Sequence, residues 1–247
     1  GQFTWHLAAA WDLTVSGRYT HEKKRARQLQ TPTVLHTNTP TVLVPPAGPA
    51  AAIHDISARR TENDFSPSAN LQWRPDDDTM LYASVARGFK GGGFDMQNDG
   101  VQAVAAGKFE FEDENVTAYE IGAKLQLLDG AARANIALFR SEFDELQVST
   151  IDSATTTFNV GNAASAVSQG VEADLNWAIG ERALLTAAFA WLDAEYDEFP
   201  DAPCNFARIA AGSCTGPNQT TSLAGEPLPF APEVTATAFA LAKSLGK

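Results

Sequence analysis

Long stretches of strict apolar–polar alternation constrain this chain more than any other feature. Apolar residues or glycine occupy every second position from Trp11 to Tyr19, from Tyr119 to Leu127 and from Val171 to Trp177. Successive side chains of a β-strand point to opposite faces, so this period predicts strands with one apolar face and one polar, charged face. Helical periodicity almost never occurs, and the expected fold class is therefore all-β.

The links between the predicted strands alternate between tight turns and longer loops. Pro75 with the aspartates that follow it, and Asp129-Gly130, have the chemistry of tight turns. An antiparallel up-and-down sheet then places all tight turns at one end and all longer loops at the other. The longer links span 25–56, 94–113, 151–155 and 199–227. The predicted strands span 2–7, 11–24, 57–74, 79–93, 114–128, 131–150, 156–178, 182–198 and 228–243.

Strand length favours a membrane over water. A strand of roughly 18 residues at about 3.3 Å each is about 60 Å long, whereas a tilted strand crosses a bilayer with about 9–11 residues. Strands of soluble sandwiches have about 5–6 residues. The pattern therefore predicts an antiparallel up-and-down transmembrane β-barrel that projects past the lipid. Tryptophans close to the predicted tight turns suit a lipid–water interface, and they are Trp5, Trp11, Trp73 and Trp177.

Composition and motifs exclude several functions. The net charge of -12 argues against a nucleic-acid partner, which would need clustered Lys and Arg. The only basic cluster, HEKKRAR (21–27), is interpreted as a solvated strand end or loop. No stretch approaches the roughly 18 apolar residues of a membrane helix. No nucleophile–base spacing occurs, so the chain is not expected to be an enzyme, and neither catalytic residues nor a cofactor are predicted.

The cysteines and one acidic segment were candidates for metal binding. Cys204 and Cys214 lie ten residues apart in a Gly- and Pro-flanked region, and the four histidines all lie far upstream. A loop disulfide made in an oxidising compartment is therefore favoured over a zinc site. The segment DMQNDG (95–100) partly matches a calcium loop, but Ala106 stands where a bidentate glutamate belongs. An acidic loop is favoured there, and no metal site is expected.

Several segments, taken in this order, resemble the TonB-dependent outer-membrane receptors. The likeness is strongest over residues 63–240 and extends upstream through WDLTVSGRYTHEKK. The segments are NDFSPSANLQWRPDDDTMLYASVARGFKGGGF, ENVTAYEIGAKLQLLDGAARANIALFRSEFDELQV, NVGNAASAVSQGVEADLNW and GEPLPFAPEVTATAFA. The resemblance implies a partial barrel over residues 1–247, about nine of an expected 22 strands, with the N-terminal plug absent. The chain is thus expected to be an internal piece of a receptor, or the product of a truncated gene.

The resemblance also implies a function. It implies uptake of ferric siderophores or other bulky nutrients across the bacterial outer membrane, driven by the TonB complex acting through the plug. The implied partners are the TonB complex, outer-membrane lipid and lipopolysaccharide, and a siderophore or similar ligand. Two alternatives stay open, a passive outer-membrane porin or barrel adhesin and a soluble sugar-binding β-sandwich.

The glycine-rich segment RGFKGGGF (87–94) is expected at the loop end of its strand. Glycines there let a strand bend and let another backbone approach closely, so a role in the architecture of the barrel rim is favoured. Direct ligand contact is the second interpretation. The candidate ligand-binding residues are Arg87, Phe89, Lys90 and Phe94.

The alternation also assigns side chains to the two faces of the barrel wall. Polar residues are expected to face a hydrated lumen or a plug, and apolar residues are expected to face lipid. The predicted lumen-facing residues are Glu120, Lys124, Glu172 and Asp174. The predicted lipid-facing residues are Tyr119, Ile121, Leu125, Val171, Leu175 and Trp177.

Overall fold

The fold is built almost entirely from antiparallel strands. It is known from a computed structural model of the whole chain. The structure describes residues 1–30, 33–35, 42–44, 54–96, 107, 109–152, 157–216 and 219–242.

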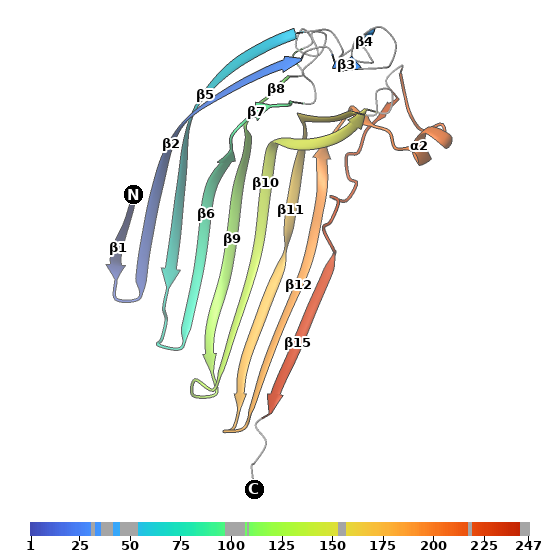
Figure 1. Ribbon diagram of the computed structural model, residues 1–247. Helices are drawn as coiled ribbons and strands as arrows, with labels where there is room; N and C mark the ends of the chain where they lie inside the picture. Colours follow the sequence, from blue (N-terminus) through green and yellow to red (C-terminus); the bar gives the residue numbers. More distant parts are fainter. Residues whose placement is uncertain are drawn as a thin grey trace.

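Nine strands form one continuous sheet (Figure 1). Their order is β1-β2-β5-β6-β9-β10-β11-β12-β15, so every main strand pairs antiparallel with the main strands before and after it along the chain. This order confirms the predicted up-and-down meander. The strands are β1 (Gln2–Ala8), β2 (Trp11–Gln30), β5 (His54–Trp73), β6 (Thr79–Lys90), β9 (Glu114–Leu127), β10 (Ala132–Asp152), β11 (Thr157–Ile179), β12 (Ala183–Glu198) and β15 (Val234–Ala242).

The two ends of the sheet differ, as the alternation of links predicted. Four tight turns lie at the lower end in Figure 1, and the longer connections lie at the upper end. In the turn between β9 and β10, Leu128, Asp129 and Gly130 all have positive φ, at 56°, 52° and 81°. Asp and Gly tolerate this left-handed backbone, and the Asp129-Gly130 pair therefore suits a sharp reversal.

The short elements of the described part of the chain lie at the loop end. Three two-stranded hairpins and one helical turn lie there. They are β3 (Thr33–Leu35) with β4 (Val42–Val44), β7 (Gly93–Phe94) with β8 (Glu110–Phe111), β13 (Ala202–Pro203) with β14 (Thr220–Thr221), and α2 (Phe206–Ala210).

Three predicted boundaries were wrong. The expected loop 25–56 is strand at both of its ends, because β2 and β5 stay paired as far as Gln30 opposite His54. The basic cluster HEKKRAR therefore lies inside a long strand rather than in a loop. The strand expected from residue 228 begins only at Val234, and β6 ends at Lys90, before the three glycines.

The register sorts side chains by polarity across the whole sheet. One cross-strand row, which runs through all nine strands, is apolar throughout. It consists of Trp5, Leu13, Leu71, Ala83, Ile121, Leu138, Val171, Trp191 and Val234. The neighbouring row points to the opposite face, and most of its nine residues are polar. It consists of His6, Asp12, Gln72, Tyr82, Gly122, Ala137, Glu172, Ala190 and Thr235.

The apolar face forms a band of nearly constant height, which we call the apolar band. On β2, β5, β9, β11, β12 and β15 the alternate residues are apolar or glycine over nine positions, for example from Tyr119 to Leu127. Eight steps of about 3.3 Å give about 26 Å along the strand, which matches the span that a transmembrane strand requires. Aromatic rings mark both limits of the band. Trp11 and Trp73 stack near the turns with ring centroids 5.4 Å apart, and Tyr19, Phe65, Tyr119 and Trp191 lie toward the loops.

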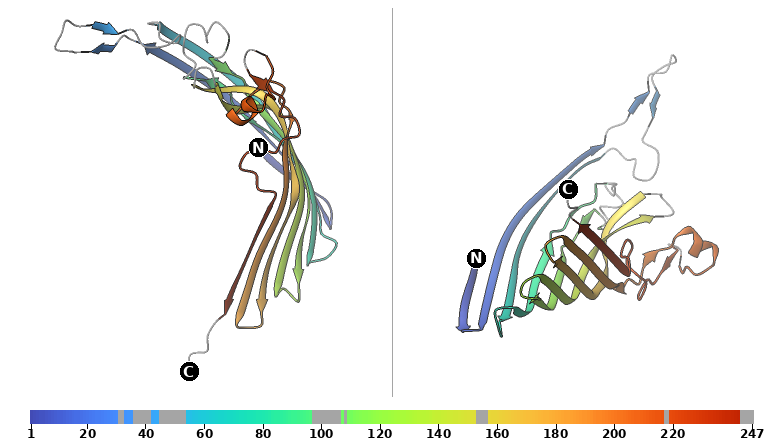
Figure 2. Two further views of the ribbon diagram at one scale, coloured as in Figure 1. Left: turned by 90° about the vertical axis from the view of Figure 1, so that its right-hand side faces the viewer. Right: turned by 90° about the horizontal axis from the view of Figure 1, so that it is seen from below.

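The sheet is curved, and the loop elements lie on its concave side (Figure 2). The apolar band is not covered by any described residue, since Tyr119 and Ile121 are 46% and 56% exposed. Among described residues the small buried core lies instead at the loop end, where Ala164 and Tyr196 pack with Phe199 and Ala202. A β-sandwich would bury the apolar face between two sheets, so the alternative of a soluble sugar-binding sandwich was wrong.

Adjacent alanines on β12 test the assignment of the two faces. Ala187 lies in the middle of the apolar band, whereas Ala188 points to the concave face. In lipid vesicles, Ala187→Arg is expected to lower the free energy of unfolding by about 2–4 kcal/mol, because a cation at mid-bilayer is poorly solvated. Ala188→Arg is expected to cost less than about 1 kcal/mol, since a lumen position is hydrated. Denaturant titration followed by tryptophan fluorescence measures both, and equal costs would contradict the assignment.

Candidate functional site

The three glycines after β6 cross the concave face of the β2–β5 hairpin. The Lys24 ammonium donates a hydrogen bond of 2.5 Å to the carbonyl oxygen of Gly92, and the Gly92 N–H donates to Glu62 Oε1 at 2.9 Å. We call residues 91–96 with 109–113 the inner strap, because they lie across the inner face rather than continuing the sheet. Its first part is thus held by charged side chains of two other strands.

An ion network holds the inner strap from the side of the β2–β5 hairpin. Arg60 pairs with Glu62 and donates to Glu112 at 2.5 Å, and Asp113 lies 3.6 Å from its guanidinium. The side chains of Arg60 and Glu62 are only 12% and 9% exposed. The hydrogen bond from Arg60 to Glu112 raises the guanidinium pKa further above its ordinary value, more than burial lowers it. Arg60 therefore stays charged, and its carboxylate partners compensate for the burial of its guanidinium.

Neutral side chains of β10 and β11 hold the same stretch of the inner strap from the opposite side. The Gln147 amide donates to the carbonyl oxygens of Lys90, Gly91 and Glu112 at 3.2, 3.3 and 3.0 Å. Asn162 both accepts from the Glu112 N–H at 2.6 Å and donates to the Glu112 carbonyl at 3.0 Å. The strap therefore bridges the concave face from the β2–β5 hairpin to β10 and β11.

Close approach requires glycine at Gly92 and leaves little room at Gly91. A Cβ on Gly92 would stand 2.3 Å from the backbone oxygen of Phe111 and 2.8 Å from the Arg60 side chain. A Cβ on Gly91 would stand 2.7–2.8 Å from charged atoms of Glu62, Glu22 and Lys24. At Gly92 only a residue without a side chain lets the two segments meet, whereas at Gly91 the neighbouring atoms are ends of flexible side chains. This geometry supports the architectural interpretation of RGFKGGGF.

The four candidate ligand-binding residues do not converge on one point. Arg87 is exposed and donates to Asn115 at 2.9 Å, and Phe89 follows on the same strand face. Lys90 points to the opposite face and lies 3.6 Å from Glu114. Phe94 stacks on buried Phe109, with centroids 5.5 Å apart. Ligand contact by any of them stays a prediction.

The four predicted lumen-facing residues do gather on one surface. Glu120, Lys124, Glu172 and Asp174 line a hollow of about 460 Å³ on the concave face. Tyr82 donates to Glu120 at 2.5 Å, and Asn135 donates to both oxygens of Asp174 at 2.9 and 3.0 Å. The residues predicted to face lipid lie on the opposite face, as the register requires. The hollow is a polar, hydrogen-bonded surface at mid-height of the wall. Its contacts with water or with a plug stay predictions.

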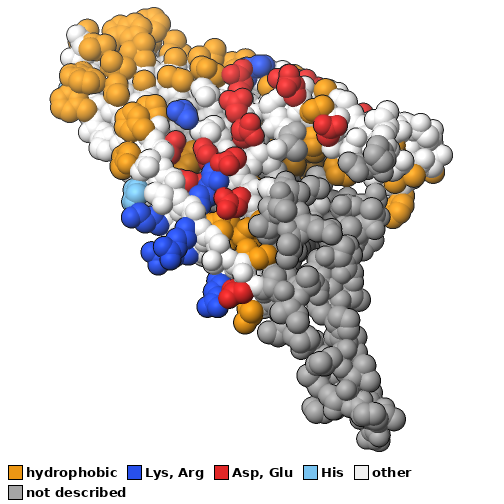
Figure 3. Space-filling model, turned by 90° about the horizontal axis from the view of Figure 1, so that it is seen from above, with side chains coloured by type: hydrophobic (Ala, Val, Ile, Leu, Met, Phe, Trp, Pro, Cys, Tyr) orange, Lys and Arg blue, Asp and Glu red, His pale blue; other side chains and the backbone are white. Residues whose placement is uncertain are grey.

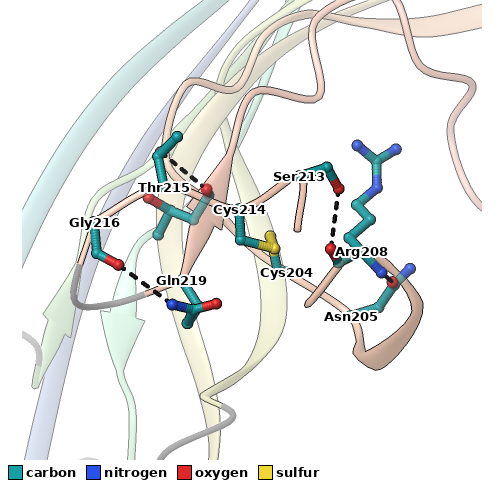
Figure 4. The surroundings of a disulfide bond; sticks show 9 residues. Cys204, Asn205, Arg208, Ser213, Cys214, Thr215, Gly216 and Gln219 are labelled. Carbon is teal, nitrogen blue, oxygen red and sulfur yellow. Dashed lines mark hydrogen bonds between the residues drawn. A yellow bond between two sulfur atoms is a disulfide. The ribbon is translucent and has the colours of Figure 1, made fainter. Parts of the chain in front are cut away.

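A disulfide closes the loop that carries α2 (Figure 4). Cys204 and Cys214 are bonded, with Cα atoms 6.3 Å apart. Within the closed segment Asn205 accepts from the Arg208 N–H at 2.9 Å, and the Ser213 hydroxyl donates to the Arg208 carbonyl at 3.1 Å. The loop stands beside the small core at the upper end of β12, and α2 presents an exposed Phe206.

Among described residues, no group of three or more His, Cys, Asp or Glu side chains could hold a metal ion. Residues 97–106, which include most of the calcium-loop match, lie outside the described residues. Within the described part of the chain, no helix is long and apolar enough to cross a membrane.

Sequence reasoning missed the side chains that hold the inner strap. Lys24 belongs to the cluster that was interpreted as a solvated strand end or loop, and that interpretation was wrong for this residue. Arg60 and Glu62 lie 36 and 38 positions further along the chain, and only strand pairing brings them beside it. The alternation of charges within β2 was the one available indication that some of them face inward.

A glycine substitution tests the strap. Gly92→Ala is expected to push Phe111 away at a cost of about 1–3 kcal/mol and to loosen residues 91–96 and 109–113. Backbone hydrogen exchange of the strap should then quicken about tenfold or more. Gly161→Ala is the matched control, because a Cβ on Gly161 meets nothing within 4 Å. Unchanged exchange in Gly92→Ala would show that the close approach has no structural role.

Comparison with known proteins identifies the family. The family described as "TonB dependent receptor-like, beta-barrel" matches residues 1–244. The metal-pseudopaline receptor CntO of Pseudomonas aeruginosa is 30% identical over 142 residues, which are 57% of this chain and 18% of that protein. The probable TonB-dependent siderophore receptor PiuA of Acinetobacter baumannii is 25% identical over 190 residues, 76% of this chain and 24% of that protein.

Solved structures share the fold. The ferric yersiniabactin uptake receptor FyuA from Yersinia pestis superposes with a TM-score of 0.67 at 16% identity, covering 97% of this chain and 30% of that one. The structure of PiuA gives a TM-score of 0.64 at 21% identity, covering 98% and 30%. The chain spans about a fifth to a third of the length of these relatives. The chain therefore belongs to the family of TonB-dependent receptors, which are β-barrel proteins of the bacterial outer membrane.

Proposed function

We propose that this chain forms part of the wall of an outer-membrane receptor that takes up metal–siderophore complexes. The observation that carries the proposal is the division of one sheet into an apolar face of membrane height and a polar concave face. The relatives named as a metal-pseudopaline receptor and as a probable TonB-dependent siderophore receptor support the ligand class. Residues 1–247 would supply about nine strands of a barrel of about 22.

Open sheet edges support the proposal of a partial wall. Within the described residues β1 and β15 pair on one side only. Backbone N–H and C=O groups inside a bilayer must be paired, since no water is available to them. Both edges would therefore pair with further strands of the same barrel, and a plug domain outside residues 1–247 would fill the lumen.

The proposed mechanism gives the wall a passive role. The loop end would form an extracellular vestibule, and the polar concave face would keep the lumen hydrated. Ligand entry would depend on rearrangement of the plug, which the TonB complex would drive. The inner strap would then narrow the vestibule from one side, because it lies across the concave face. Lipopolysaccharide and other lipid would contact the apolar band.

Uptake of radioactive iron tests the proposal. The receptor that contains this chain is produced in a bacterial strain without siderophore receptors of its own, with and without TonB, and ferric siderophores are supplied. Saturable accumulation is expected only with TonB, whereas surface binding should not need it. Uptake that rises linearly with concentration and ignores TonB would instead support the passive porin. Binding to other cells without uptake would support the adhesin.

A further inference from the structure

Basic side chains gather on the convex side of the β2–β5 hairpin, above the apolar band. We call this surface the outer basic patch, and it consists of Lys23, Arg25, Arg27 and Arg59. These residues occupy the same strand face as Tyr19 and Phe65, which pair across the hairpin at the upper limit of the apolar band. All four side chains are exposed. Seen from the loop end, Lys and Arg side chains cluster along one flank of the molecule (Figure 3).

The two faces of the hairpin differ in how their basic side chains are paired. On the concave face Lys24 lies 3.2 Å from Glu22 and 3.7 Å from Glu62, and Arg60 pairs with three carboxylates. On the outer face Arg27 pairs with Asp55 at 2.7 Å, and this hydrogen-bonded pair lowers the pKa of the Asp55 carboxyl. Among described residues, no carboxylate lies within ion-pair distance of the other three patch cations.

The patch also opposes like charges. Arg25 and Arg59 are direct cross-strand partners in the register. Like charges at such positions destabilise a sheet. The chain has a net charge of -12, so it does not lack carboxylates that could neutralise them. The arrangement is therefore explained best by anions from outside the chain.

The height of the patch identifies those anions. Lys23 lies four residues beyond Tyr19, which is about 13 Å along the strand and less in height because transmembrane strands tilt. Long basic side chains at this level reach the headgroup layer. In outer-membrane barrels the longer loops are extracellular, so this layer belongs to the outer leaflet. We propose that the outer basic patch binds the phosphate groups of lipopolysaccharide.

Titration with diphosphoryl lipid A tests the proposal. The purified receptor in zwitterionic detergent is compared with the variant Lys23→Gln/Arg25→Gln/Arg59→Gln, and bound lipid is counted by native mass spectrometry. Each basic residue near an anionic surface is worth about fivefold in affinity, so the triple variant should bind about 100-fold more weakly. Dephosphorylated lipid A should bind the unaltered receptor weakly, and an excess of inorganic phosphate should not displace the lipid. Displacement by free phosphate, or equal binding of dephosphorylated lipid, would overturn the proposal.

A matched control removes the same charge elsewhere. Arg18→Gln/Arg133→Gln/Arg182→Gln neutralises three exposed arginines outside the patch and should change the affinity less than about threefold. Equal losses in the two variants, or no loss in the patch variant, would contradict a specific site. Should the patch variant fail to fold, Lys23→Arg/Arg25→Lys/Arg59→Lys and a salt series on the unaltered receptor take its place. The proposal is supported if the charge-conserving variant keeps its affinity for lipid A and the affinity of the unaltered receptor falls as the salt concentration rises. An affinity that does not depend on salt refutes it. These outcomes do not depend on which ligand the receptor takes up.

Discussion

The structure depends on one constraint, which is that strand pairing must satisfy the backbone throughout a layer where lipid offers no hydrogen bonds. A meander of neighbouring strands meets it with local connections only. The sheet then has just two surfaces, and side chains divide between them at every second residue. The apolar row from Trp5 to Val234 and the polar row beside it are the direct result. In this architecture the hydrophobic residues face outward, and only a small core is needed at the loop end.

Beyond the apolar band, toward the loops, side chains still alternate between the two faces of the sheet, but both faces carry charged residues. Along β2 and β5 the inward positions hold ion pairs that clamp the inner strap, and the outward positions hold the basic patch. Charges at half-buried places need partners, so Arg60 and Glu62 are surrounded by polar groups. On the outer face the like charges of Arg25 and Arg59 lie opposite each other, an arrangement that favours an anion from outside the chain. The β2–β5 hairpin thus holds the inner strap on its concave face and carries the outer basic patch on its convex face.

Strand positions could be predicted because the period of two persists over most of each strand. Prediction failed where both faces become polar, as in residues 25–30, since alternation then disappears from the hydropathy although pairing continues. The start of β15 was predicted too early. Pairing with β12 begins only at Val234, opposite Trp191, and the prolines lie before that position. The disulfide partners were the only two cysteines in the sequence, and the lack of further zinc ligands near them favoured a bond between them.

The sequence by itself determined the all-β class, the order of turns and loops, the membrane setting and the family resemblance, because each follows from short-range periodicity and local turn chemistry. Only the tertiary structure decided how the glycines are used. Lys24, Arg60, Gln147 and Asn162 come from four different strands, and their convergence on residues 90–112 depends on register and curvature. Such long-range contacts leave no periodic trace in the chain, since each partner is an ordinary polar residue until the sheet brings them together.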